Sequence, residues 1–171
     1  MMYIVRREQP QDVPKIREVN KRAFGQEQEA SVVDKLRENC NSILSLVALA
    51  GNEVVGHILF SPTVIEGKNG RLVGSCLAPL AVLPEYQRRG IGSELVQTGV
   101  ARIREGGCPY IIVLGHPEYY ARFGFEPASR FGISSEWQVP DEAFMILMLN
   151  RRAMKDISGV AKYREEWAEA M

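Results

Sequence analysis

The alternation of apolar and polar positions predicts antiparallel strands in the first half of the chain. One apolar run extends from Ile43 to Ala50 and a second from Glu53 to Ile65, and the turn dipeptide Gly51-Asn52 separates them. This arrangement predicts a β-hairpin. After another glycine-containing turn, residues 72–83 predict a third long strand, partly interrupted by Pro79.

Apolar positions spaced by three and four residues predict two helices before this hairpin. The chain begins with a short predicted strand over residues 4–7. Asp12 is placed to cap the N-terminus of a first helix, with Pro14 in its opening turn. A second helix is predicted from Glu27 to Glu38. Both helices therefore lie between the first strand and the hairpin.

The middle of the chain changes from alternation to a strand–helix–strand pattern. Pro84 ends the third long strand, and helical spacing follows from Ile91 to Ile103. Gly106-Gly107 is typical of a helix C-terminus. The unbroken apolar run from Tyr110 to Leu114 favours a strand buried on both faces. A crossover of this length predicts that this strand is parallel to the one before the helix.

The last third predicts a short aromatic helix over residues 119–123, a strand over 144–149 and a terminal helix over 159–171. The predicted fold class is therefore α/β, with a mixed α+β sheet that is antiparallel in its N-terminal half. The length fits a single domain over residues 1–171. Its core is expected over residues 4–149, with a helical extension over 150–171.

Composition narrows the functional classes. Lys plus Arg equals Asp plus Glu at 21 each, which argues against a dedicated nucleic-acid binder. Three scattered cysteines, Cys40, Cys76 and Cys108, without a C-x-x-C pair and with only two histidines, argue against a metal site. Unpaired thiols, no signal-peptide pattern and no apolar run long enough to span a membrane predict a cytoplasmic protein without membrane association.

The turn after the third long strand carries the strongest chemical signal. Gly90 and Gly92 lie where the chain enters a helix, and the unpaired amides and positive dipole end of a helix bind anions such as phosphates. Arg88 and Arg89 add positive charge. A nucleotide P-loop needs lysine after its second glycine, and a dinucleotide fingerprint needs a third glycine where Leu95 stands. A plain turn with a solvated basic pair remains an alternative.

Four segments in order resemble the GNAT superfamily of N-acyltransferases, and most closely its YhbS-like subgroup of predicted acetyltransferases. Residues 87–92, Gln-Arg-Arg-Gly-Ile-Gly, are similar to the family's Q/R-x-x-G-x-G/A signature for acetyl-CoA. Residues 45–61 resemble the family's hairpin, 80–84 its coenzyme-side strand and 119–125 its Y/F-Y-x-x-x-G-F segment. The resemblance covers residues 4–149.

This resemblance implies a GNAT-like fold in which the central parallel strand pair splays apart to admit acetyl-CoA as cosubstrate. The pantetheine arm would pair with the strand edge at residues 80–82, and the pyrophosphate would meet the amides of residues 88–93. The implied coenzyme-binding residues are Leu80, Ala81, Val82, Gln87, Arg88, Arg89, Gly90, Ile91, Gly92 and Ser93.

The implied activity is N-acetyl transfer to a primary amine by direct attack in a ternary complex. A backbone N–H near Val82 would stabilise the oxyanion. Tyr120 occupies the family's general-acid position, although it can instead simply pack against the core. His116 and Glu85 are candidate bases, each with an alternative as a turn or surface residue. The compact segment 115–118 lacks the asparagine that many members carry.

The acceptor is expected to be a small-molecule or peptide amine. In this fold the substrate walls correspond to residues 24–39 and 128–141. Phe131, Glu136 and Trp137 are candidate lining residues there, with ordinary surface and core positions as the alternative. Related domains also suggest a homodimer. A non-catalytic acyl-CoA sensor or interaction module on the same fold is the alternative function, and a nucleotide-binding protein of another fold is a third hypothesis.

Overall fold

The computed structural model describes residues 3–171, which form a mixed sheet of nine strands. The strand order is β1-β2-β3-β4-β5-β8-β6, and β9 pairs with β3 and β7. The chain divides into two compact units. Unit 1 contains residues 3–60, Ala78–Ala101 and Glu166–Met171, and unit 2 contains Ser61–Leu77 and Arg102–Glu165. The strands β3 (Glu53–Gly67) and β4 (Gly70–Val82) contribute residues to both units.

Unit 1 contains the predicted hairpin. The strands β1 (Ile4–Arg7) and β2 (Leu44–Ala50) are antiparallel, and β2 is antiparallel to β3 across the turn at residues 51–52. The strand β4 continues through Pro79. The prediction of an interruption at this proline was therefore wrong.

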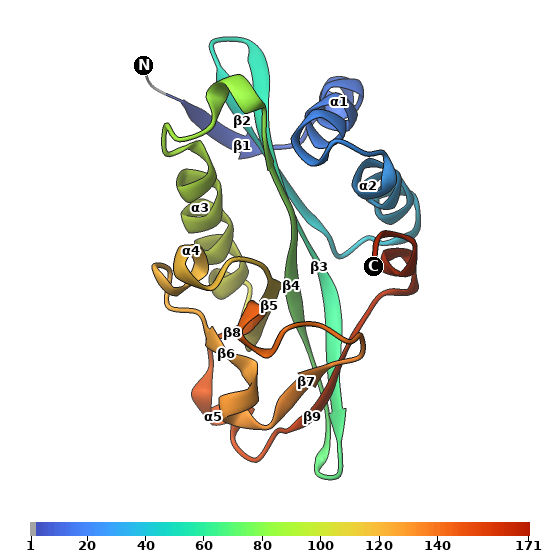
Figure 1. Ribbon diagram of the computed structural model, residues 1–171, viewed down its shortest axis with the longest axis vertical. Coiled ribbons are helices and arrows are strands. Elements are labelled where there is room, and N and C mark those ends of the chain that lie inside the picture. The colour runs from blue at the N-terminus through green and yellow to red at the C-terminus, as the bar shows by residue number, and fades with distance from the viewer. Residues whose placement is uncertain (1–2) are drawn as a thin grey trace. The chain divides into compact units, whose positions relative to one another are not determined.

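Helices cover both faces of these strands in unit 1. The helices α1 (Val13–Phe24) and α2 (Gln28–Asn39) lie on one face, and α3 (Ile91–Glu105) begins on the other (Figure 1). The apolar stripe predicted for the second helix is buried, because Val32, Val33 and Leu36 are each at most 1% exposed. Periodicity therefore located these helices to within a few residues.

Asp12 does not cap α1 as predicted. Its side chain makes no capping bond to that helix. The carboxylate instead accepts from the Arg6 guanidinium at 2.7 and 3.1 Å and from the Gln9 amide at 2.7 Å, within a 3₁₀ turn, η1 (Pro10–Asp12). The guanidinium beside it lowers the pKa of Asp12. The Arg6 guanidinium on β1 thus binds the Asp12 carboxylate, which would otherwise accept from the first amides of α1.

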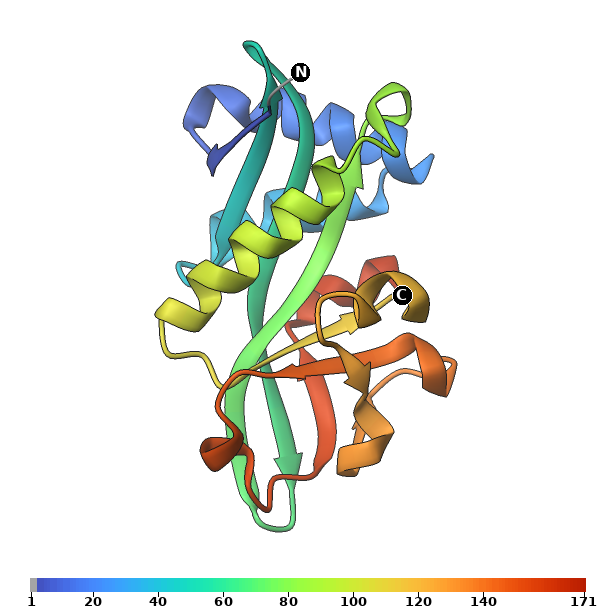
Figure 2. The same ribbon diagram turned by 90° about the vertical axis from the view of Figure 1, so that its left-hand side faces the viewer.

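Two glycines allow α3 to approach β3 closely. A Cβ at Gly56 of β3 would lie 3.1 Å from both Ile91 Cγ2 and Leu95 Cδ1 at the start of the helix. A Cβ at Gly99 would overlap the ring of Phe60. In Figure 2 the helix crosses the strands on the side facing the viewer. These contacts fix where α3 begins.

Unit 2 contains the short parallel pair. The strand β5 (Tyr110–Leu114) pairs in parallel with β4 at Ser75–Ile111 and Cys76–Ile112, and antiparallel with β8 (Phe144–Met148). The mixed α/β fold with one central parallel pair is therefore confirmed. This unit also contains α4 (Pro117–Ala121), β6 (Glu126–Pro127), η3 (Ala128–Phe131), β7 (Ile133–Ser135), η4 (Asp141–Ala143) and α5 (Arg151–Met154).

The predicted terminal helix over residues 159–171 was wrong. Residues Gly159–Tyr163 form the strand β9, and Glu165–Ala170 form a 3₁₀ helix, η5. The strand β9 pairs antiparallel with β3 and parallel with β7. At its first residue a Cβ on Gly159 would overlap the carbonyl oxygen of Glu66, so the backbones meet where a side chain would not fit. Pairing with distant strands overrides the local helical pattern here.

Candidate functional site

The turn from β4 to α3 lies entirely in unit 1 and is held by hydrogen bonds within the turn and to β3. The Leu83 amide donates to Val55 O of β3 at 2.9 Å, and the Tyr86 amide closes a 3₁₀ turn, η2 (Pro84–Tyr86), on Leu83 O at 2.8 Å. The Gln87 side-chain amide then donates back to Val82 O at 3.0 Å. Gln87 thus fixes the path of the chain between the strand and the helix.

The backbone of this turn takes a conformation that presents amides at the helix entrance. Gly90 has φ +85°, and a Cβ at this position would have open space around it, so glycine is needed there for its backbone conformation and not for want of room. Arg88 has φ 63°, which is uncommon for a residue with a side chain. The Glu94 amide donates to Gly90 O at 3.1 Å. The amides of Ile91 and Gly92 lie in the first turn of the helix, where no carbonyl of the same helix can accept from them. This geometry suits an anion.

Positive charge accompanies these amides. Arg88 and Arg89 are exposed, and the Arg89 guanidinium lies 5.2 Å from the centre of the Tyr86 ring. Glu85 also belongs to the turn, and Arg22 of α1 forms two hydrogen bonds with its carboxylate, at 2.9 and 3.0 Å. Glu85's own backbone amide and Arg22 lower the pKa of this carboxyl. A lowered pKa makes Glu85 a weaker proton acceptor than its sequence position suggests.

The predicted residues of the coenzyme-side strand form the end of β4. Ala81 and Val82 are 1% and 9% exposed, and Leu80 is partly buried. The structure therefore brings residues 80–82 and 87–93 together as one strand–turn–helix within unit 1.

Tyr120 belongs to unit 2, where α4 holds it in an aromatic cluster. Its ring makes edge contacts with the rings of Tyr119 and Phe125, whose centres lie 5.1 and 5.7 Å from its own. A Cβ at Gly115 would overlap this ring, so the chain passes close to it. Burial, with a smaller contribution from Tyr119, raises the pKa of Tyr120 above its ordinary value. The hydroxyl therefore keeps its proton and can act as a donor.

His116 is the residue before α4 and is exposed. Its side chain makes no capping bond, while its carbonyl accepts from the Tyr120 amide at 3.1 Å. The sequence left open that the His116 side chain bonds the backbone of the turn. No such bond to the first turn of α4 is present to support this alternative. The role of His116 as a base stays a prediction.

The sequence did not reveal a buried polar network around His57. This side chain is 0% exposed, and Ser45 Oγ lies 2.9 Å from its Nε2. Asn20 Nδ2 lies 3.1 Å from its Nδ1 and also donates to Ile16 O at 3.0 Å. Because Nδ2 can only donate, His57 Nδ1 accepts, and the neutral ring carries its proton on Nε2.

The network continues to a partly buried ion pair. Ser45 Oγ donates to Glu8 Oε1 at 2.7 Å, and Arg37 donates to both oxygens of Glu8 at 2.7 and 2.8 Å. Burial lowers the pKa of His57 to about 4. Asn20 Oδ1 is buried without a partner among the described residues. In the sequence this network is visible only as one polar residue, His57, within an apolar strand. Its partners Asn20 and Ser45 come from other segments of the chain.

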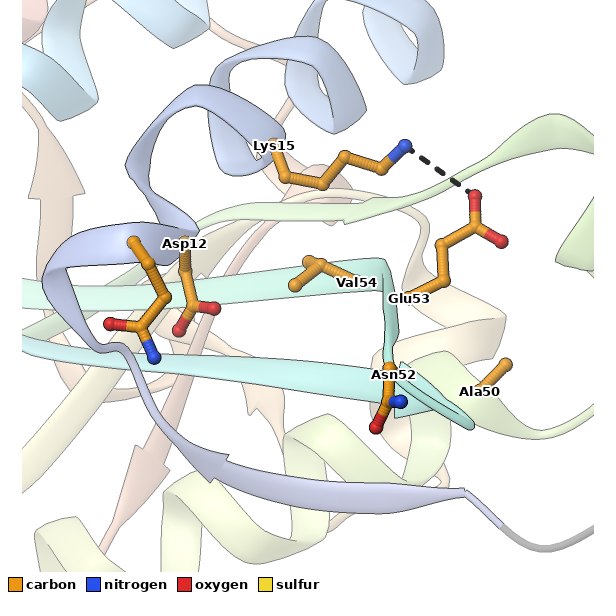
Figure 3. Close-up of a pocket in the computed structure, with 7 residues that line it drawn as sticks. Asp12, Lys15, Ala50, Asn52, Glu53 and Val54 are labelled. Atoms are coloured by element: carbon orange, nitrogen blue, oxygen red, sulfur yellow. Dashed lines mark ion pairs between the residues drawn. The ribbon is translucent and has the colours of Figure 1, made fainter.

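An open pocket of about 580 Å³ lies elsewhere in unit 1, between the start of α1 and the β2–β3 turn (Figure 3). Its charged groups are already compensated, because Lys15 Nζ lies 3.4 Å from Glu53 Oε1 and Asp12 pairs with Arg6. None of the site residues predicted from the sequence lines it. Its lining residues are Gln11, Asp12, Lys15, Ala50, Asn52, Glu53 and Val54.

Residues 3–171 contain no group of three or more His, Cys, Asp or Glu side chains placed to hold a metal ion. No helix within the same residues combines the length and the apolarity needed to cross a membrane.

Comparison with known proteins decides the family. The sequence model of the acetyltransferase (GNAT) domain matches residues 4–128. The chain belongs to the GNAT acetyltransferase family. This confirms the resemblance drawn from the four sequence segments, and the matched range includes the β4–α3 turn and α4.

Relatives in the family span most of this chain. The uncharacterized N-acetyltransferase YjhQ of Escherichia coli is 43% identical over 134 residues, which are 77% of this chain and 74% of YjhQ. The uncharacterized N-acetyltransferase YhbS of Escherichia coli K12 is 34% identical over 165 residues, which are 96% of this chain and 98% of YhbS. The similarity to YhbS confirms the expected subgroup.

Two solved members of the GNAT family share the fold over nearly the whole chain. The crystal structure of Escherichia coli YhbS in complex with CoA has a TM-score of 0.90 at 33% identity, covering 96% of this chain and 91% of that one. A Brucella melitensis GNAT family acetyltransferase in complex with acetyl-CoA has a TM-score of 0.79 at 32% identity, covering 97% and 98%.

Proposed function

We propose that this protein is an acetyl-CoA-dependent N-acetyltransferase that acts on a primary amine. The observation that carries the proposal is the strand–turn–helix over residues 80–93. There the amides of Ile91 and Gly92, the glycine conformation at position 90 and two arginines converge on the entrance of α3. The family membership and the two related structures, which contain CoA and acetyl-CoA, support this assignment.

The residues present fit the chemistry of coenzyme A. A diphosphate accepts hydrogen bonds and carries negative charge, which helix amides and guanidinium groups complement. The pantetheine arm contains amides that can pair with strand backbone at residues 80–82. Gln87 would position the turn through its bond to Val82 O rather than contact the phosphates. The proposed coenzyme site consists of Leu80, Ala81, Val82, Gln87 in this positioning role, Arg88, Arg89, Gly90, Ile91, Gly92 and Ser93.

In the proposed reaction the neutral amine nitrogen bonds to the thioester carbonyl carbon and the carbon–sulfur bond then breaks. The nitrogen loses one proton to a base or to water, and the departing sulfur gains one, so the products are an amide and a thiol. A backbone N–H near Val82 would stabilise the oxyanion. His116, exposed before α4, is the candidate acceptor for the amine proton, directly or through water.

Tyr120 is the proposed proton donor to the departing sulfur. Its raised pKa keeps the phenol protonated, so it presents a donor throughout the neutral range. The same raised pKa makes a lasting tyrosinate costly, and Tyr120 must regain its proton from solvent within each turnover. The chain would work as one catalytic domain with a small-molecule or peptide amine as acceptor.

Two measurements test the proposal. Titration calorimetry with acetyl-CoA should show binding that Gly92→Leu abolishes, because a side chain there would occupy the helix entrance, while Gly106→Ala at the far end of α3 should bind normally. A panel of primary amines with acetyl-CoA should then give thiol release with at least one of them. Binding without release from any amine would favour the non-catalytic sensor, and equal affinity of Gly92→Leu would remove the site assignment.

A further inference from the structure

The turn over residues 84–90 is an exposed segment of unit 1 that packing alone does not hold. Tyr86 is partly buried, and the other side chains of these residues are exposed. Arg88 has φ 63°, a conformation that a residue with a side chain keeps only where its surroundings impose it. Hydrogen bonds must therefore supply the order that burial does not.

Arg22 supplies two such bonds from a different element. It lies in the last turn of α1, and its Nη2 donates to both carboxylate oxygens of Glu85, at 2.9 and 3.0 Å. The backbone amide of Glu85 and then Arg22 lower the pKa of this carboxyl, and Lys15 of the same helix adds to the effect. An arginine stays protonated, so both charges persist in the neutral range. The pair joins α1 to the turn within unit 1.

Helix α1 is itself fixed to the strands of unit 1. Ile16 and Val19 are at most 1% exposed, and Asn20 Nδ2 lies 3.1 Å from Nδ1 of His57 on β3. Arg22 extends to the turn from this anchored helix. The position of α1 is therefore passed to residues that have no buried side chain of their own.

We propose that Arg22 is a positioning residue for the coenzyme: through Glu85 it holds the turn in the conformation that presents the amides of Ile91 and Gly92 to the diphosphate. This inference rests on the proposed function. It gives Glu85 an anchoring role in place of the role of a base. A ligand that needs one conformation binds more weakly in proportion to the molecules that leave it. Because an exposed ion pair shifts such an equilibrium modestly, its loss should weaken acetyl-CoA binding about two- to fivefold.

Nuclear magnetic resonance without coenzyme tests the positioning by itself. In Arg22→Ala the backbone order parameters of the amides of residues 85–90 should fall from about 0.85, typical of rigid backbone, toward about 0.6. Arg22→Lys should keep the wild-type values, because one ammonium nitrogen can donate to both oxygens as Nη2 does. The matched control is Lys21→Ala, since Lys21 pairs at 3.1 Å with Glu27, outside the turn. Equal order parameters in wild type and Arg22→Ala would overturn the inference.

Titration calorimetry with acetyl-CoA tests the consequence for binding. Arg22→Ala and Glu85→Ala should each weaken binding about threefold, and the double variant should be no weaker than either, because each change removes the whole pair. Arg22→Lys and Lys21→Ala should bind as the wild type does. Urea unfolding should give all these variants nearly the wild-type free energy of unfolding, since the pair is exposed.

The two proposals fail in different ways. A wild type that bound no acetyl-CoA would overturn the proposed function, and the coenzyme role of Arg22 with it. Normal binding by the wild type together with unchanged affinity of Arg22→Ala would overturn the positioning role alone. Losses that add up in the double variant would also overturn it, because Arg22 and Glu85 would then act separately.

Discussion

His57 illustrates how a single buried side chain ties stability to pH. Its ring is enclosed between Asn20 of α1 and Ser45 of β2, and the facing charged groups are Glu8 and Arg37. Burial disfavours the imidazolium more than Glu8 favours it, so the folded pKa is about 4. The neutral ring is the form that the Asn20 and Ser45 hydrogen bonds require.

We expect wild-type stability to fall between pH 7 and pH 5. The unfolded chain binds a proton at His57 below about pH 6.5 and the folded chain does not until about pH 4, so the free energy of unfolding decreases as pH falls across this window. The loss should be about 2 kcal/mol at pH 5, measured by urea unfolding.

The chain supplies its own control for this pH dependence, since His116 is the only other histidine and is exposed. His57→Gln should flatten the dependence between pH 5 and 7, whereas His116→Gln should keep it. A His57→Gln protein with the wild-type slope would show that His57 does not cause it. Glu8, whose pKa Arg37 and Ser45 lower despite the opposing effect of burial, contributes only at more acidic pH.

Tyr120→Phe should reduce kcat about a hundredfold while leaving the affinity for acetyl-CoA nearly unchanged. The ring contacts with Tyr119 and Phe125 persist in phenylalanine, so the fold should be retained. Tyr119→Phe, in the same α4 helix, is the control and should keep wild-type turnover. A Tyr120→Phe enzyme with full activity would assign Tyr120 to packing alone.

At the scale of helices and strands, the position of α3 depends on two glycines that have no side chain at its contact with β3. Gly56 leaves room for Ile91 and Leu95, and Gly99 leaves room for the Phe60 ring. Both contacts hold the helix against β3, and the amides proposed to bind the diphosphate belong to its first turn. The geometry of the site thus depends on packing between a strand and a helix and not only on the turn that joins them.

Gly56→Ala should lower the free energy of unfolding by about 1–3 kcal/mol, because the added methyl overpacks the contact 3.1 Å from Ile91 and Leu95. It should also weaken acetyl-CoA binding, since the helix entrance must shift. Urea unfolding and calorimetry measure the two effects. Gly106→Ala, whose Cβ meets nothing nearer than 3.5 Å, should do neither. Destabilisation without any change in affinity would contradict the link to the site.

The elements recovered from the sequence are those whose signals are local. The helix at residues 91–105 and the strand at 110–114 follow from periodicity, and the position of the turn between β4 and α3 follows from the glycines at the helix entrance. The binding of an anion at this turn stays a prediction. The strand β9 and the role of Asp12 were missed because their partners are Glu66 and Arg6, which no local pattern connects to them. Glu136 and Trp137 were candidate residues from the sequence, whereas the ring contact between Trp137 and Tyr163 depends on the register of β7 against β9.

For the chain as a whole, the division into units does not follow the order of synthesis. Unit 1 draws on residues 3–60, on the β4–α3 segment and on Glu166–Met171. In the last of these, Trp167 is 4% exposed and Glu169 pairs with Lys35 of α2. The fold of unit 1 therefore includes a short segment far along the sequence.

Trp167→Ala should destabilise the protein by about 3–5 kcal/mol, because it removes a large buried ring from a well-packed position. Phe24→Ala in the same unit is the comparison, since Phe24 is 40% exposed and its loss should cost less than about 1 kcal/mol. Chemical unfolding of the full chain distinguishes the two. Equal losses would mean that η5 contributes little to unit 1.

The late contribution of Trp167 has a consequence for biosynthesis. While the ribosome is still adding β5 to β9, the helices α1 and α2 have already emerged without the ring that completes their unit. Contacts between residues so distant in sequence form slowly, and exposed apolar surface on a nascent chain attracts chaperones. A stalled chain that stops before Trp167 should therefore remain sensitive to protease in α1 and α2, even though both helices are fully translated.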